Sequence, residues 1–134
     1  MIEERYYFKT TLSLPFEHAV ERVRSALAEE GFGVLTEIDV KATLKKKLDV
    51  DFRPYIILGA CNPPLAYKTL QQEEQIGLML PCNVVVQEAH DGGSIVAALN
   101  PLVAMAVVQN RGLESTAKEV TEKLRRVVTA LEKS

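Results

Sequence analysis

The stretch Tyr55-Ile56-Ile57-Leu58-Gly59-Ala60-Cys61-Asn62-Pro63-Pro64 holds the transition that decides the fold. Its first four residues form a nearly continuous apolar run, which is typical of a central strand covered on both faces. Asn62 can cap a helix, and the two prolines suit a first helical turn but not a central strand. We therefore predict a strand that delivers the chain through Cys61 into a helix running toward Glu74.

The pairing of cysteine with asparagine recurs at Leu80-Pro81-Cys82-Asn83-Val84. Proline cannot donate a hydrogen bond to a strand ladder, so Pro81 should place a bulge or an edge position just ahead of Cys82. If the chain beyond it is extended, alternation directs the Cys82 thiol to the same sheet face as Val84 and Val86.

A hairpin should follow the second cysteine. Residues 83–89 are rich in valine, the run His90-Asp91-Gly92-Gly93 carries the glycines that a tight turn needs, and residues 94–99 then return antiparallel. Residues 76–80 are also expected to be extended. The pattern of residues 101–108 fits either a helix or a strand, and the Asn-Pro pair at its start favours a helix.

Strands and helices alternate in the N-terminal half. Aromatic and β-branched residues over 6–12 predict a strand, and a helix should start at Pro15 and stop at Gly31. After a second strand over 32–38, Asp39 is expected to cap a short helix with apolar residues at four-residue intervals. The longest helix lies at the C-terminal end, and its apolar stripe consists of Leu113, Ala117, Val120, Leu124, Val127, Val128 and Leu131. This order predicts an α+β fold with helices packed over a mainly antiparallel sheet.

Size and charge narrow the class of protein. The 134 residues suit one domain, 1–134, and the net charge of −2 argues against a nucleic-acid partner, which would need a concentrated basic surface. Lys41, Lys45, Lys46 and Lys47 form the one local basic cluster, which can be a solvated face or an anion contact. We expect a cytoplasmic protein with no membrane partner, because no segment resembles a signal peptide or a membrane span.

The two cysteines leave a chemical and a structural interpretation open. Cys61 just before a helix start would have its thiolate favoured by the helix dipole, but free cysteine is also a common buried residue. Cys82 can pack in the core or act as the partner of Cys61 in a redox couple. In a reducing compartment we expect free thiols rather than a structural disulfide.

Other chemistries find weaker support in the sequence. We predict no metal site, because His90 lies eight residues beyond Cys82 and the four histidine and cysteine side chains cannot meet easily. No nucleophile elbow or glycine-rich phosphate loop occurs. Glu37 and Asp39 can serve as paired carboxylates, although Asp39 also fits a helix cap. Asn83 needs a hydrogen-bond partner if it is buried among valines, so it is a candidate ligand contact.

Three ordered motifs carry a resemblance to a known family. Residues 31–39 (GFGVLTEID), 58–63 (LGACNP) and 80–86 (LPCNVVV) resemble the domain of unknown function 302 family of small bacterial and archaeal domains. The resemblance implies a curved, mainly antiparallel sheet with helices packed on one face, similar to the TATA-binding-protein-like class, and a homodimer. It implies neither DNA binding nor a reaction. The matching positions are Gly33, Glu37, Asp39, Cys61, Asn62, Pro63, Cys82 and Asn83.

Three functional hypotheses follow; the sequence leaves open whether the protein is an enzyme, and it identifies no cofactor. The first is a domain that binds a small ligand in a pocket formed by Cys61, Asn62, Cys82, Asn83 and Glu37. The second is thiol redox or thiol-transfer chemistry, with Cys61 as the reactive thiol and Cys82 as its partner. The third is a dimeric interaction module without catalysis that uses its C-terminal helix.

Overall fold

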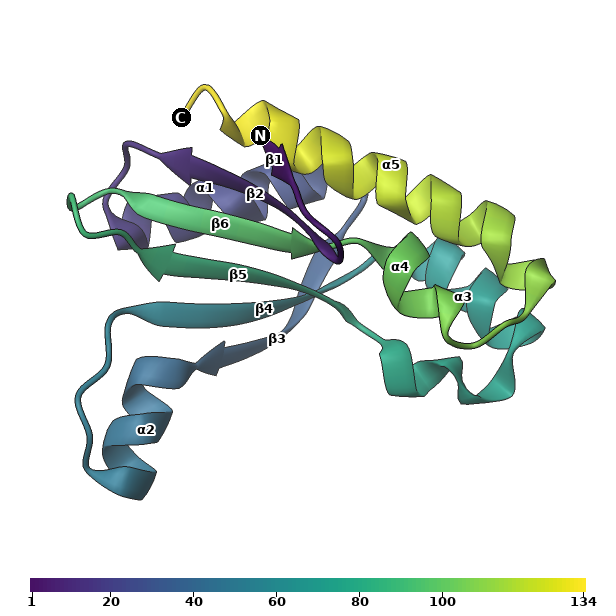
Figure 1. Ribbon diagram of the computed structural model, residues 1–134, viewed down its shortest axis with the longest axis horizontal. Coiled ribbons are helices and arrows are strands. Elements are labelled where there is room, and N and C mark those ends of the chain that lie inside the picture. The colour runs from purple at the N-terminus through teal and green to yellow at the C-terminus, as the bar shows by residue number, and fades with distance from the viewer.

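The computed structural model describes residues 1–134 and contains one six-stranded sheet (Figure 1). The sheet order is β1-β2-β6-β5-β4-β3, and every neighbouring pair is antiparallel. The strands are β1 (Ile2–Glu3), β2 (Tyr7–Leu12), β3 (Gly33–Asp39), β4 (Tyr55–Cys61), β5 (Cys82–Glu88) and β6 (Ser94–Leu99). The predicted α+β class with a mainly antiparallel sheet is therefore confirmed.

Helices begin where the sequence places cap residues. Asn62 accepts a hydrogen bond from the Leu65 amide, and Asp39 accepts one from the Ala42 amide. Both arrangements satisfy amide groups that a helix start leaves without a partner. The helices are α1 (Phe16–Glu29), α2 (Val40–Leu48), α3 (Pro63–Gln72), α4 (Pro101–Ala106) and α5 (Glu114–Leu131), with two 3₁₀ helices, η1 (Glu74–Met79) and η2 (Arg111–Leu113).

The main core lies between one face of the sheet and the helices α1 and α5. A row of directly opposed residues crosses four strands on this face, and all of its members are fully buried: Leu58, Val84, Ala98 and Phe8. The predicted apolar stripe covers this face from Val120 to Leu131, whereas its first two members, Leu113 on η2 and Ala117, pack in a smaller second core. Cys82 is buried on the same face as Val84 and Val86, so its predicted orientation is correct.

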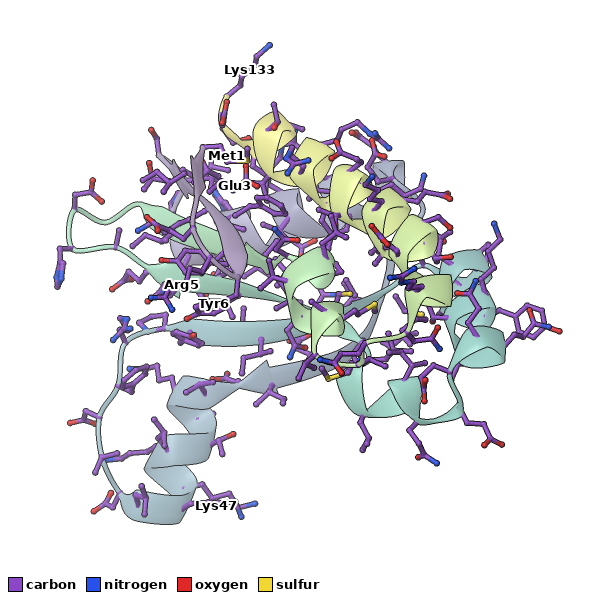
Figure 2. All side chains as sticks on the ribbon, turned by 45° about the vertical axis from the view of Figure 1, so that its right-hand side comes forward. Met1, Glu3, Arg5, Tyr6, Lys47 and Lys133 are labelled. Atoms are coloured by element: carbon purple, nitrogen blue, oxygen red, sulfur yellow. The ribbon has the colours of Figure 1, made fainter.

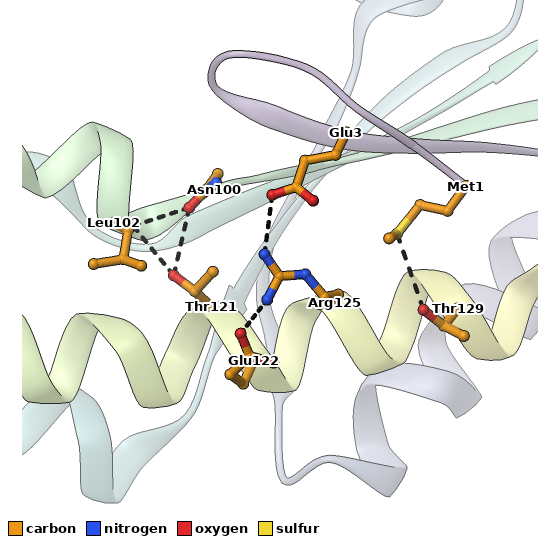
Figure 3. A network of polar contacts seen from close by, with 8 residues as sticks. All are labelled: Met1, Glu3, Asn100, Leu102, Thr121, Glu122, Arg125 and Thr129. Atoms are coloured by element: carbon orange, nitrogen blue, oxygen red, sulfur yellow. Dashed lines mark hydrogen bonds and ion pairs between the residues drawn. The ribbon is translucent and has the colours of Figure 1, made fainter.

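Polar contacts fasten the chain terminus and α4 to helix α5 (Figure 3). The Arg125 guanidinium donates to Glu3 at 2.9 Å and to Glu122, and it lies 4.9 Å from the centre of the Phe8 ring. Asn100 accepts from the Leu102 amide at 3.1 Å, and the same amide lies 3.2 Å from the Thr121 hydroxyl. The segment 101–108 is therefore helical at its start, as the Asn-Pro pair favours.

The segment before Cys82 differs from the prediction. The sequence predicts extended structure over residues 76–80, but most of them belong to η1. No strand lies beside them, and Ile76 instead packs in a small second core with Met105 and Leu113. Pro81 precedes β5 rather than interrupting it, and the irregularity of the sheet lies on β3 between Val34 and Thr36.

The second face of the sheet carries no helix across its centre. A row parallel to the buried one runs along this face through Ile57, Val85, Ala97 and Lys9, all half-buried. An antiparallel sheet with a solvated face usually alternates apolar and polar residues, but these strands are apolar on both sides. The expectation that residues 55–58 are covered on both faces is met on one face only within this chain.

Helix α2 forms an arm that extends beyond edge strand β3, away from α1 and α5 (Figure 1). None of its nine residues is buried, and Lys47 lies near its far end (Figure 2). Leu48 is 67% exposed although it belongs to the predicted apolar stripe. No helix of the protein has both the length and the apolar character that crossing a membrane requires.

Candidate functional site

The two cysteines and Asn62 line one hollow at the end of β4 and the start of β5. Ala60 and Cys82 are directly opposed in the sheet, which places Cys61 close to Cys82. The hollow has a volume of about 30 Å³, and most of its lining is apolar, including Phe32, Leu65 and Met105. A space of this size holds a single water molecule rather than an organic ligand.

Both thiols are held in their neutral form. Burial raises the pKa of Cys82 from 9.0 to about 11, and the nearby Cys61 contributes to the shift. Burial also raises the pKa of Cys61. Asn62 rather than Cys61 occupies the cap position of α3, so the amide at the helix start donates to its carboxamide and not to the thiol. Since the thiolate is the reactive form, neither cysteine has the environment of a nucleophile.

Asn62 connects two helices through its side chain. Its amide nitrogen donates to the Glu30 carbonyl oxygen at 3.3 Å, at the end of α1, while its oxygen caps α3. The side chain is therefore engaged at both ends. Both of its side-chain contacts lie within the chain: one caps α3, and the other joins the start of α3 to the end of α1.

Asn83 and Glu37 lie outside this hollow. Asn83 follows Cys82 on the same strand, so its exposed side chain points to the opposite face of the sheet. Glu37 forms an exposed ion pair with Arg24 of α1. The structure thus brings together three of the five expected residues and separates the other two from them.

A larger hollow lies on the open sheet face, and Asn83 lines it. Its volume is about 410 Å³, and its walls include Tyr6, Tyr7, Tyr55 and Lys9 together with apolar residues of β5 and β6. Tyr6 and Tyr7 form an edge-to-face pair with ring centres 4.9 Å apart. In Figure 2 Tyr6 lies at the turn between β1 and β2, at the rim of the sheet.

Arg53 lies beside this open-face hollow and contacts two of its lining residues, Gln87 and Tyr55. Its guanidinium donates twice to the Gln87 side-chain oxygen, at 3.0 and 2.8 Å, and it stacks over the rings of Phe52 and Tyr55. Gln87 lines the hollow, and its amide group keeps two hydrogens to donate. The sequence does carry a signal for this site: in these strands both the odd-numbered and the even-numbered positions are apolar, whereas a strand with one solvated face would alternate.

The remaining polar groups and clefts are spread over the molecule. No set of three or more His, Cys, Asp or Glu side chains is gathered in a way that could hold a metal ion. A cleft of about 370 Å³ between α4, η2 and α5 shares Met105 with the cysteine hollow. Its Asn110 side chain is already bonded to Gln72 and Glu73, which ties η2 to the end of α3.

The fold and the site define a small α+β domain whose antiparallel sheet carries its long helices on one face and leaves the other bare. Within this class, the chain belongs to the family described as Domain of unknown function DUF302, whose family model matches residues 8–131. The crystal structure of an uncharacterized conserved protein DUF302 from Bacillus stearothermophilus is similar, with a TM-score of 0.86 and 27% sequence identity. The match covers 93% of this chain and 97% of that chain. The search of curated proteins found no match.

Proposed function

We propose that residues 1–134 act as one non-catalytic binding domain that functions as a homodimer, with the open sheet faces of two copies packed against each other. The observation that carries the proposal is the apolar row on this face, in which Ile57, Val85 and Ala97 are only half-buried. A second sheet packs about 10 Å away from such a face and removes its side chains from water. An identical face is complementary under a twofold axis, as in most soluble oligomers.

The exposed area of the chain supports this proposal. The protein exposes 7930 Å², about 900 Å² more than the roughly 7,000 Å² typical of a monomer of this mass. Each partner in a standard stable interface contributes about 800 Å². The surplus therefore corresponds to the contribution of one protomer to one interface.

Exposed apolar residues on β3 and on the α2 arm also support the proposal. Leu35, Ile38 and Leu48 are large apolar side chains exposed by about half or more. A nine-residue helix is marginal in water without tertiary packing, and α2 has no buried residue to supply it. Ile38 is directly opposed to Ile57, so the apolar surface of the open face continues onto the arm.

The other two hypotheses have less support in the geometry. A ligand pocket around the cysteines would have to enlarge a hollow of about 30 Å³, and thiol chemistry would have to overcome the raised pKa of both thiols. The face proposed for dimerisation is the open sheet face and not the C-terminal helix, because the apolar stripe of α5 is buried in the core. Two free thiols fit a reducing compartment such as the cytoplasm.

Light scattering after size-exclusion chromatography tests the proposal. The wild-type protein should have about twice the 14.9 kDa of one chain, and Val85→Lys should have the mass of one chain because it places a charge at the centre of the interface. Leu78→Lys is the matched control, since Leu78 lies on η1 and is 84% exposed. This control should remain dimeric. A wild-type protein that is monomeric at high concentration would refute the proposal.

A further inference from the structure

We infer that the open-face hollow is a binding site for a small aromatic anion, such as an aryl carboxylate or sulfonate. In the proposed homodimer this site is enclosed between the two copies, so its enclosure rests on the proposed function. Its location and its chemistry rest on the chain alone. Three features of the hollow define the ligand: its aromatic walls, one cation without a partner, and an excess of hydrogen-bond donors.

The volume and walls fit a small planar molecule. At about 410 Å³ the hollow lies within the range of about 300–1,000 Å³ typical of ligand sites. Tyr6, Tyr7 and Tyr55 stand at its edge, and Val85, Ala97 and Leu99 form its floor. Tyrosine rings offer faces for stacking as well as hydroxyl groups that reach water, so they suit a ligand that is both aromatic and polar.

Lys9 supplies the positive charge that selects an anion. It lies on β2 opposite Ala97 in the apolar row, half-buried, and it takes part in none of the ion pairs of the protein. The nearby cation Arg53 is already bonded to Gln87. When a second copy covers the face, the Lys9 ammonium loses water, and an unpaired charge in such a position is costly. A bound anion removes this cost.

The polar groups around Lys9 also favour an anionic ligand. Because the Gln87 oxygen accepts both bonds from Arg53, the side of Gln87 left to a ligand is its donating amide. Asn83 makes no hydrogen bond through its side chain within the chain, and its amide can donate to the ligand as well. A molecule with several acceptor oxygens satisfies these donors, whereas a cation or a hydrocarbon satisfies none of them.

A pair of fluorescent dyes tests the inference. The probe is 8-anilinonaphthalene-1-sulfonate, and its uncharged counterpart N-phenyl-1-naphthylamine keeps the aromatic rings but lacks the sulfonate. The sulfonate dye should bind saturably at no more than one molecule per chain. Lys9→Gln should weaken it about tenfold, the loss typical of removing a charge-assisted contact, and should leave the uncharged dye unchanged. Lys47→Gln, at the exposed end of α2, is the matched control and should change neither dye.

Two further measurements distinguish failure of the ligand site from failure of the dimer. Circular dichroism of Lys9→Gln and Lys9→Met checks that each variant folds, and light scattering of the same samples gives the mass. A dimer in which both Lys9 variants bind the sulfonate dye like the wild type overturns the site and leaves the dimer standing. A monomer whose dye binding depends on Lys9 overturns the dimer and supports the site. An equal loss for both dyes, or an equal effect of Lys47→Gln, also overturns the site.

Discussion

Raising the pH above 9 should destabilise the protein through one buried thiol. Cys82 is 4% exposed, and burial, assisted by Cys61, raises its pKa from 9.0 to about 11. In the unfolded chain this thiol titrates near its ordinary value. Between pH 9 and 11 the unfolded chain therefore loses the Cys82 proton while the folded chain keeps it. The stabilising contribution is complete below pH 9 and is lost progressively as the pH approaches 11.

The size of the effect follows from the difference between the two pKa values. One pKa unit corresponds to about 1.4 kcal/mol, so a shift of this size removes roughly 2–3 kcal/mol from the free energy of unfolding by about pH 11. A domain of this size has a total stability of about 5–15 kcal/mol. The loss is therefore large enough to measure by denaturant unfolding.

The assay compares wild type with Cys82→Ala in urea near pH 8 and near pH 11. The two proteins share every other titratable side chain, so the difference between them isolates the Cys82 thiol. Near pH 8 the variant should be less stable by about 1 kcal/mol, because it leaves a small cavity. Near pH 11 this deficit should be gone and the variant should be the more stable protein. A deficit of the same size at both pH values would refute the reasoning, since it would mean that the thiol titrates alike in both states.

Two further substitutions test how the structure around the cysteines is built. Gly59→Ala should destabilise the protein by about 1–3 kcal/mol, because the new Cβ would lie 2.0 Å from the Thr36 hydroxyl. Gly77→Ala is the control, since its Cβ would meet nothing within 4 Å. Equal melting temperatures for the two variants would contradict this prediction. Asn62→Ala should cost about 1 kcal/mol through loss of the α3 cap, measured by urea unfolding. Asn62→Asp should recover only part of it, because a carboxylate still accepts from the Leu65 amide but cannot donate to the Glu30 carbonyl oxygen. An alanine variant as stable as wild type would show that the cap contributes nothing.

Local interactions explain what could be predicted from the sequence. Caps at Asp39, Asn62 and Asn100 depend on side chains that reach only two or three residues along the chain, so the predicted helix starts are correct. Alternation is equally local, and it places Cys82 on the buried face. The hairpin between β5 and β6 likewise requires only the glycines at its turn.

Contacts between distant segments explain what could not be predicted. Residues 76–80 have the composition of a strand, but Ile76 packs against Met105 and Leu113, and no local rule anticipates these partners. The short strand β1 exists only because Ile2 pairs with Lys9 across a turn. The opposition of Ala60 and Cys82 is a matter of strand register. No local pattern in the sequence specifies that register, so the sequence could suggest that the two cysteines approach each other but could not require it.

The separation of Asn83 from the cysteine hollow was, by contrast, available from alternation alone. A strand that directs Cys82 inward must direct its neighbour outward, so one pocket cannot include both side chains at full reach. The two Cys-Asn pairs therefore serve different purposes. Cys61, Asn62 and Cys82 lie on the helix side, where they fill space and cap α3. Asn83 lies on the open face with its amide free.

This division between the two faces favours the bare face of the sheet as the binding surface. On the helix side, the Asn62 side chain is bonded at both ends inside the chain, and the hollow beside it has room for no more than a single water molecule. On the open side, Lys9 and Asn83 lack partners and lie among tyrosines and aliphatic residues that water covers poorly. A group without an internal partner gains more from an external one, because binding it displaces only water. We therefore propose the open face as the surface on which a second copy and an anionic ligand are each bound with a net gain in free energy.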